Sequence, residues 1–233
     1  MQELTTRQQN KAETRHLLLQ AGLALFVEQG YEGTRAVEIA SRAGVAVGTL
    51  YLHFGDKAGL LQAILLQGAS ELHERVMEVY KNPPSDPTAL AQAHIEAIVR
   101  FLEENQKKAR FLLEYASRRD SASAQVIDSI VEQIEHSIIA GIKMGVYRPD
   151  INPALAARAE ANMNLGLLTW WMENPQRATR KEIIETLTKF RASGLHYSRE
   201  HSHDAHSSSL AAKSGRGSDA DSQGSAIRPI ERI

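Results

Sequence analysis

The sequence predicts an all-α protein in which a three-helix N-terminal domain precedes a larger helical domain. Two observations support this fold class. Apolar residues recur three and four positions apart along the 233-residue chain, as on one face of an α-helix, and no stretch alternates convincingly between apolar and polar residues as a half-buried strand does. Glycines and prolines divide this pattern into segments of helical length.

The first helix carries a single apolar stripe and is expected to end at Gly30. Its stripe falls at positions i, i+3, i+4, i+7 and i+8, which is the periodicity of a helix that buries one face. The stripe consists of Leu18, Ala21, Gly22, Leu25 and Phe26. Tyr31 follows the glycine and is expected to close the end of this helix.

Residues 30–57 predict two short helices joined by a tight turn. The first, over about residues 36–43, can stop at Gly44 because glycine adopts the left-handed conformation without a steric penalty. The second, over about residues 46–53, then leaves at a steep angle. Such a pair is a helix-turn-helix, a motif that places its second helix in the major groove of DNA. The apolar residues expected to lock the pair together are Ile39, Ala40, Val45, Leu50 and Phe54.

The outward face of the second short helix is the predicted DNA-contacting surface. Val47 and the methyl group of Thr49 suit a thymine methyl, Gly48 allows a close backbone approach, and the Thr49 hydroxyl suits a base or a phosphate. Further along are three hydrogen-bond donors that are expected to hold phosphates, namely Tyr51, His53 and Lys57. The alternative for the two aromatic donors is that they cap a small core.

The order of these residues resembles the DNA-binding domain of the TetR/AcrR family of bacterial transcriptional regulators, from about Thr14 to Leu65. The matching segments are Leu25-Phe26-Val27-Glu28-Gln29-Gly30-Tyr31, Ile39-Ala40, Ala43-Gly44-Val45, Gly48-Thr49-Leu50-Tyr51, His53-Phe54, and Lys57 with Leu60-Leu61. In that family a dimer binds a palindromic operator and usually represses transcription until a small ligand releases it. The resemblance implies the same activity here.

Three positions depart from the family pattern. Arg35 stands where a capping threonine is usual, which leaves Thr34 as the expected cap of the second helix and Arg35 for a phosphate or the minor groove. Ala46 replaces a serine that normally caps the recognition helix and contributes about 1 kcal/mol. Val47 is apolar, so we expect specificity to depend on Arg35, Thr49 and DNA shape. The predicted DNA-binding set is Thr34, Arg35, Ala46, Val47, Gly48, Thr49, Tyr51, His53 and Lys57.

The charge distribution gives DNA little long-range attraction. The formal net charge is -1, and residues 1–60 hold as many acidic as basic side chains. The basic residues Arg7, Lys11 and Arg15 recur every four positions, so they form a ridge on the first helix. This ridge either leads to the DNA-binding face or is an ordinary solvated face. Few phosphate contacts would give binding a shallow salt dependence.

Beyond the helix-turn-helix the chain is expected to remain helical. Asp56 is a candidate N-cap for a helix that runs to about Tyr80 and links the two domains. The prolines at 83, 84 and 87 break the chain, and further helices are predicted over about 87–105, 107–119, 121–145, 153–174 and 178–197. The predicted organisation is therefore a DNA-binding domain over 1–57, a helical ligand-binding and dimerisation domain over 86–197, and a disordered tail over 198–233.

The helices over 153–174 and 178–197 are the predicted homodimer surface. The first presents Ala154, Ala157, Ala161, Leu165, Leu168 and Met172 at helical spacing, and the second presents Ile183, Ile184, Leu187 and Phe190. With their symmetry mates these helices would form a four-helix bundle. The alternative is that both helices cover the core of their own chain.

An effector pocket is predicted within the larger domain. Its expected lining is apolar, which suits a small hydrophobic or amphipathic molecule. The apolar candidates are Phe101, Phe111, Tyr115, Ile127, Ile134, Ile138 and Trp170, and the polar candidates are His94, Glu114, Arg118, Asn162 and Asn164. Each apolar candidate has ordinary core packing as its alternative.

Several classes of protein receive no support from the sequence. No catalytic motif occurs, which argues against an enzyme. The histidines of the tail, His201, His203 and His206, lack neighbouring ligands, so neither metal nor cofactor is expected. The lack of cysteine, of a signal peptide and of a run of roughly 18–20 apolar residues predicts a cytoplasmic protein that binds no membrane.

The function expected from these observations is that of a DNA-binding transcriptional regulator. A homodimeric repressor that binds a palindromic operator and is released by a small hydrophobic effector fits best. The alternative is a transcriptional activator or a ligand-independent DNA-binding protein with the same fold. The operator, the regulated genes and the effector are not encoded in any visible motif.

Overall fold

The structure is a computed structural model that describes residues 6–118 and 121–195. These residues form nine α-helices and no strand, which confirms the predicted all-α fold. The helices are α1 (Thr6–Gln29), α2 (Ala36–Arg42), α3 (Val47–Phe54), α4 (Lys57–Val79), α5 (Pro87–Glu104), α6 (Gln106–Ala116), α7 (Ser121–Lys143), α8 (Pro153–Glu173) and α9 (Arg180–Leu195). The predicted disordered tail and its histidines lie outside the described residues.

Side-chain caps explain where three of the long helices begin. The carboxylate of Asp56 accepts from the backbone N–H of Gly59 at 2.7 Å, and that of Asp86 accepts from Ala89 at 2.8 Å. Asn152 accepts from the N–H of Leu155 at 3.2 Å. Each cap satisfies a backbone donor that the first helical turn leaves unpaired. These signals are local, which is why the predicted helix bounds lie within a few residues of the observed ones.

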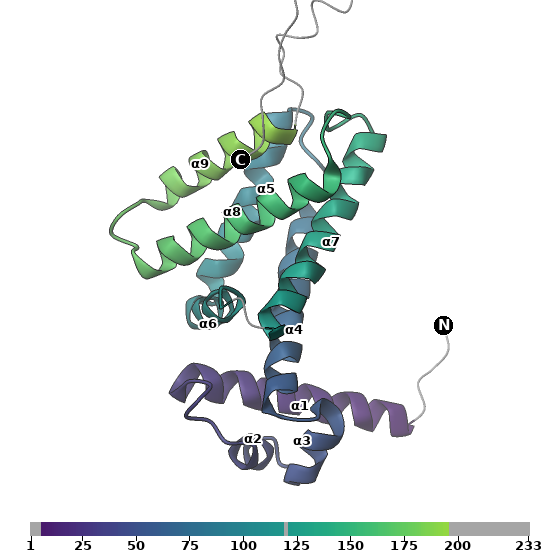
Figure 1. Ribbon diagram of the computed structural model, residues 1–233, viewed down its shortest axis with the longest axis vertical. Coiled ribbons are helices and arrows are strands. Elements are labelled where there is room, and N and C mark those ends of the chain that lie inside the picture. The colour runs from purple at the N-terminus through teal and green to yellow at the C-terminus, as the bar shows by residue number, and fades with distance from the viewer. Residues whose placement is uncertain (1–5, 119–120, 196–233) are drawn as a thin grey trace, which may run out of the picture. The chain divides into compact units, whose positions relative to one another are not determined.

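The N-terminal helices share one core with the start of α4. Leu18 and Phe26 of α1, Ile39 of α2, Leu50 of α3 and Leu60 of α4 are fully buried together. This core also includes two aromatic residues of α6, which are described below. The helix-turn-helix therefore rests on α1, and α4 leads away from it into the remaining helices (Figure 1).

The remaining helices pack around α4 and α5. α7 packs against α4 and α8, and α9 packs against α5 (Figure 1). A second core joins α4, α5, α6, α8 and α9, and a third joins α7 to α8 and to the turn at Tyr147. α4 is thus part of both the helix-turn-helix core and the second core.

The predicted dimer stripes are mostly part of the chain's own core. Ala157, Ala161 and Leu168 of α8 are buried, as are the three aliphatic residues of the α9 stripe, Ile183, Ile184 and Leu187. These positions are wrong as an intermolecular surface, because α8 and α9 turn their most apolar stripes toward α5 and α7. The exposed face instead carries Leu155, Trp170 and Phe190, the last with 63% of its surface exposed.

Candidate DNA-binding surface and internal cavity

The turn between α2 and α3 has the predicted glycine geometry. Gly44 has a φ of 72°, in the left-handed region, and the N–H of Val45 donates to the Ala40 carbonyl at 3.0 Å. This bond closes the C-terminus of α2 and directs the chain into α3. Ile39, Ala40 and Leu50 are buried between the two helices. The predicted lock between them is therefore present.

The N-terminal end of α3 presents an open backbone surface. Ala46, Val47 and Gly48 are exposed and Thr49 is half-buried. Ala46 provides no side-chain cap, and the first turn is closed only by the N–H of Thr49 donating to the Ala46 carbonyl at 2.9 Å. Because Ala46 offers no polar cap, the N-terminal end of α3 exposes the apolar side chains of Ala46 and Val47.

The predicted cap at Thr34 is wrong. The N-cap of α2 is Arg35, whose backbone N–H donates to the Glu38 carboxylate at 3.0 Å. Thr34 is only 1% exposed, and its hydroxyl donates to the Gly30 carbonyl at 2.7 Å. The hydroxyl is turned inward to hold the end of α1, so it is not available to DNA in this conformation.

The arginine at each end of α2 is paired with a glutamate. Arg35 forms a salt bridge with Glu38 at 2.7 Å, and Arg42 forms one with Glu28 of α1 at 2.5 Å. Hydrogen bonds from these arginines lower the pKa of both glutamates. Arg35 is exposed, but it would have to leave Glu38 to reach a phosphate.

Lys57 has a structural role that the sequence did not predict. Its ammonium donates to the backbone carbonyls of Tyr31 at 2.9 Å and Thr34 at 3.0 Å, and it lies 4.1 Å from the centre of the Tyr31 ring. The residue therefore fastens the start of α4 to the loop between α1 and α2. Its donors are used within the chain, so the expected phosphate clamp does not include Lys57 in this conformation.

The remaining predicted clamp residues lie on or beside the exposed face of α3. Tyr51 is 50% exposed and His53 is half-buried. Burial and the nearby charges of Lys11 and Arg15 lower the pKa of His53, so its imidazole is neutral at pH 7. Leu52 was not predicted, although it is 83% exposed and lies between them. The exposed Leu52 side chain adds to the apolar character of the α3 surface.

The basic ridge of α1 reaches the end of α3. The guanidinium of Arg15 lies 4.6 Å from the centre of the Phe54 ring, and the charges of Lys11 and Arg15 add to burial in lowering the pKa of His53. Arg7, Lys11 and Arg15 are all exposed. The ridge therefore adjoins the exposed face of α3, which was one of the two readings of the sequence.

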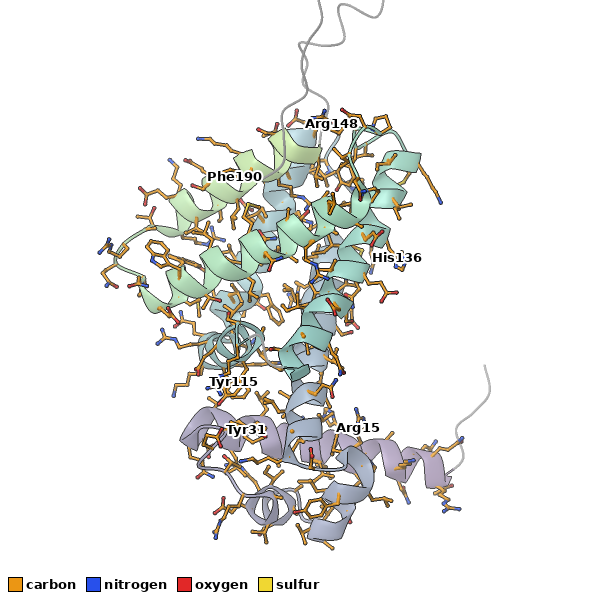
Figure 2. The ribbon with its side chains drawn as sticks, viewed as in Figure 1. Arg15, Tyr31, Tyr115, His136, Arg148 and Phe190 are labelled. Carbon is orange, nitrogen blue, oxygen red and sulfur yellow. The ribbon has the colours of Figure 1, made fainter. Side chains whose placement is uncertain are left out.

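Two aromatic residues of α6 join the helix-turn-helix core to the larger domain. Phe111 stacks on Phe26 of α1 with ring centres 5.8 Å apart, and Tyr115 lies 5.9 Å from Tyr31 (Figure 2). Phe111 and Tyr115 are predicted effector contacts, but neither lines the cavity described next. Both rings are buried in the core of the N-terminal helices instead.

A cavity of about 170 Å³ lies among α4, α5, α6, α7, α8 and α9. Most of its walls are apolar, with Leu72 and Val76 from α4, Ile98 from α5 and Leu168 from α8 among them. Four of the candidate effector contacts, Phe101, Ile127, Ile134 and Ile138, line it. Trp170 does not line it, because this side chain lies on the outer face of α8 while its neighbour Trp171 is buried.

Part of the cavity wall is polar and is built around a buried ion pair. Arg191 of α9 donates to Oε1 of Glu160 of α8, and both side chains are more than nine-tenths buried. Nη2 of Arg191 also donates to the hydroxyl oxygens of Tyr80 at 3.1 Å and Tyr147 at 3.0 Å. The Tyr80 hydroxyl lies 3.0 Å from Nδ1 of His94. This polar cluster consists of Tyr80, His94, Tyr147, Glu160 and Arg191.

The charge states within the polar cluster follow from burial. Burial and the charge of Arg191 lower the pKa of His94 well below its usual range, so that imidazole is neutral. Burial opposes the charge of Arg191, but Glu160 and the two tyrosines more than offset this and raise its pKa. Burial also raises the pKa of Tyr80, which remains a neutral phenol. The cluster therefore carries one positive charge beside the Glu160 carboxyl.

Comparisons with known proteins bear on the domain that contains α1 to α4. The family model described as bacterial regulatory proteins, tetR family, matches residues 18–64. The chain is 27% identical to the HTH-type transcriptional regulator AcrR of Shigella flexneri over 180 residues, which are 72% of this chain and 82% of that protein. It is 29% identical to the HTH-type transcriptional repressor KstR of Rhodococcus jostii, over 72% of this chain and 76% of that protein.

A solved structure with a similar fold supports the same assignment. NalD, the secondary repressor of the MexAB-OprM multidrug efflux pump in Pseudomonas aeruginosa, superposes with a TM-score of 0.56 at 26% identity. The match covers 82% of this chain and 99% of that one. Residues 18–64 are a TetR-family domain. The chain is a DNA-binding transcriptional regulator that is similar to members of that family over most of its length.

Sequence reasoning missed the polar cluster of this regulator, although a signal was present. Glu160 lies on α8 between the buried alanines Ala157 and Ala161, and Arg191 follows Leu187 by four positions on α9. A charged residue in register with a buried apolar stripe indicates a buried polar site. Of the polar candidates, His94 and Asn164 line the cavity, whereas Glu114 pairs with Arg118 on the surface and Asn162 donates to the Arg158 carbonyl.

None of the described helices has the length and apolar character that a membrane-spanning segment requires.

Proposed function

We propose that this TetR-family protein is a homodimeric repressor that binds a palindromic operator in the cytoplasm and is released by a small, largely apolar effector. The observation that carries the proposal is that α4 joins the two sites. Its first turns, with Leu60, Leu61 and Ile64, are packed in the helix-turn-helix core. Its later turns, with Leu72 and Val76, line the cavity. A molecule in the cavity therefore contacts the helix that directly follows the helix-turn-helix.

The proposed DNA-binding surface is the exposed end of α3 with its flanks. Val47, Gly48, Thr49 and Tyr51 would meet base edges and the backbone, together with Ala46 and His53. The ridge of Arg7, Lys11 and Arg15 would supply phosphate contacts beside the recognition helix. Arg35 joins this surface only if it exchanges Glu38 for a phosphate. A mostly apolar reading surface fits operators rich in thymine methyl groups.

The dimer is proposed to form through the exposed face of α8 and α9. Leu155, Trp170 and Phe190 are large apolar side chains exposed on these two helices. Phe190 is labelled on the outer side of α9 in Figure 2. Small or polar residues, among them Asn162 and Gly166, separate the large ones and would let a partner helix approach closely. Two copies would place their α3 helices in successive major grooves.

The proposed mechanism is a change in the distance between the two α3 helices of the dimer. An effector that fills the cavity favours a position of α4 that differs from the one DNA requires, so operator binding and effector binding oppose each other. The contacts of Phe111 with Phe26 and of Tyr115 with Tyr31 give α6 a second route to α1. In this proposal residues 1–57 form the DNA-binding domain, α4 the link, and residues 86–197 the effector and dimer domain.

The test is operator binding measured by fluorescence anisotropy. Labelled fragments from upstream of the protein's own gene are titrated with the full chain, and the bound fragment is shortened until a palindrome remains. We expect Thr49→Ala and Tyr51→Ala each to weaken binding about tenfold, because good base or phosphate contacts contribute about 1–3 kcal/mol. His136→Ala, an exposed site on α7, serves as the control.

The result that would contradict the proposal is equal binding by the wild type and both α3 variants, or no bound palindromic fragment. A reporter gene behind the bound fragment separates repressor from activator. Deletion of the regulator raises expression if it represses, and lowers expression if it activates.

A further inference from the structure

Two residues that line the cavity have a buried hydrogen-bond acceptor that lacks a donor. Among the described residues, Oε2 of Glu160 and Oδ1 of Asn164 have no hydrogen-bond partner, and both residues line the cavity. They lie four positions apart on α8, so they share one face of the helix. Glu160 is 7% exposed. An unpaired buried acceptor is costly, so a molecule that donates to these oxygens gains affinity.

The donors of the polar cluster are already engaged. Arg191 donates to Glu160, Tyr80 and Tyr147, and no side-chain nitrogen of Arg191 is left buried and unpaired in the described part of the chain. His94 is neutral. Its Nδ1 lies 3.0 Å from the Tyr80 hydroxyl, and its Nε2 lies 3.5 Å from Oε1 of Glu160. An anionic or acceptor group would therefore find the Arg191 guanidinium already bonded within the chain.

The balance of charge disfavours an ionic head group of either sign. The positive charge of Arg191 lies against the Glu160 carboxyl, and the rest of the cavity is almost wholly apolar. A carboxylate would face the Glu160 carboxyl, and an ammonium would face Arg191. Either ion would also lose its hydration on entry, which costs far more than burying a neutral hydroxyl or amide.

From these observations we infer that the effector is an apolar molecule whose polar end is an uncharged hydrogen-bond donor, a hydroxyl above all. The hydroxyl would donate to Oε2 of Glu160 or Oδ1 of Asn164, and the hydrocarbon body would fill the space along α4, α5 and α7. This inference rests on the proposal that the cavity is the effector site. It excludes acidic lipids as the preferred ligands.

The test compares four eight-carbon probes that differ only in the polar end. They are 1-octanol as a neutral donor, 2-octanone as a neutral acceptor, octanoate as an anion and octylammonium as a cation. Binding to the full chain is measured at pH 7.5 by titration calorimetry without DNA. We expect 1-octanol to bind about tenfold more tightly than 2-octanone, the value of one good hydrogen bond, and more tightly than either ion.

Variants assign the preference to the two acceptors. Asn164→Leu removes one acceptor without disturbing the ion pair, and it should reduce the ratio of octanol to octanone affinity by about threefold or more. Glu160→Gln brings an amide donor to the cavity and should shift the ratio toward the ketone. Because Glu160→Gln removes the charge that faces Arg191, the folding of this variant is checked by circular dichroism. If it does not fold, the result for Asn164→Leu decides. Ser137→Ala is the control, since this hydroxyl lines the cavity but donates to the Gln133 carbonyl at 2.9 Å.

The inference is overturned if either ion or the ketone binds as tightly as octanol, if Asn164→Leu leaves the ratio unchanged, or if none of the four probes binds. Operator release is measured separately. If octanol is preferred but operator binding is unaffected, the head-group inference stands and effector control fails. If all four probes release the operator equally well, effector control stands and the head-group inference fails.

Discussion

At the scale of single residues, long-range contacts give several side chains roles that differ from those their positions in the sequence suggest. Lys57 and Thr34 lie in the segment that the sequence predicts to bind DNA. Both side chains instead point inward and donate to backbone carbonyls between α1 and α2. Glu160 and Arg191 fall on helices that read as a dimer surface, yet they form a buried pair. The partner decides each role, and a partner can lie as far as 111 positions away in the chain, as Tyr80 does from Arg191.

Lys57→Met should destabilise the protein without creating a cavity. The substitution removes two charge-assisted hydrogen bonds to the carbonyls of Tyr31 and Thr34, so we expect the free energy of unfolding to fall by about 1–3 kcal/mol. Chemical denaturation followed by circular dichroism measures the change. Lys11→Met, at an exposed position on α1, is the control and should change stability little. Equal stability of both variants would show that the Lys57 contacts are not formed.

His94 should make stability depend on pH. Because burial and Arg191 hold its folded-state pKa well below the ordinary value of 6.5, the unfolded chain binds a proton that the folded chain does not. Stability is therefore complete above about pH 6.5 and falls as the pH drops, by up to about 2 kcal/mol at pH 5. The groups that face His94 are His73, Tyr80, Glu160 and Arg191.

Denaturation curves of the wild type and His94→Gln at pH 7 and pH 5 provide the measurement. The variant should lose less stability over this range than the wild type. Parallel losses in the two proteins would mean that His94 is protonated in the folded state.

At the scale of the elements, the helix-turn-helix depends on backbone conformation at one glycine and on an open surface at another. Gly44 has a φ of 72°, which a side chain adopts at a cost, although a Cβ there would meet nothing within 4 Å. Gly48 lies in α3 with ordinary helical backbone and open space around it. The same substitution therefore has opposite effects at the two sites.

Gly44→Ala should lower stability by about 1–2 kcal/mol through backbone strain alone. Gly48→Ala should raise stability by about 0.5–1 kcal/mol because alanine loses less freedom in a helix, and it should weaken operator binding because its methyl blocks close approach. Thermal denaturation and the anisotropy assay measure the two effects. A stabilised Gly48→Ala protein with unchanged operator affinity would place the backbone of α3 away from the DNA.

At the scale of the whole molecule, α4 connects the helix-turn-helix to the cavity. The exposed face of α8 and α9 is the surface proposed for the dimer. The cores of the two proposed domains are not separate, because Phe111 and Tyr115 of α6 are buried with Phe26 of α1. Both α4 and α6 therefore contribute to the N-terminal core and to the cavity wall. Repression by a dimer additionally requires that the exposed face of α8 and α9 be covered by a second copy.

Phe190→Glu should convert the proposed dimer to a monomer while leaving the fold intact. Phe190 is 63% exposed in one chain, so the monomer loses little packing, whereas two buried carboxylates at a symmetric interface would be costly. Sedimentation velocity measures the mass, circular dichroism checks the fold, and the variant should lose operator affinity. Lys189→Glu, at a neighbouring exposed position on α9, controls for the added charge. A Phe190→Glu protein that stays dimeric would remove this face as the interface.

The sequence by itself determined the all-α fold, the bounds of the helices within a few residues, and the DNA-binding motif. These features rest on local physics: apolar spacing, the caps at Asp56, Asp86 and Asn152, and the left-handed Gly44. Only the tertiary structure decided that Thr34 and Lys57 face inward, that Trp170 faces outward, and that Glu160 and Arg191 meet inside a cavity. The reason is that helical periodicity defines which residues share a face but not which neighbour that face meets. Burial, pairing and the chemistry of the cavity depend on that neighbour.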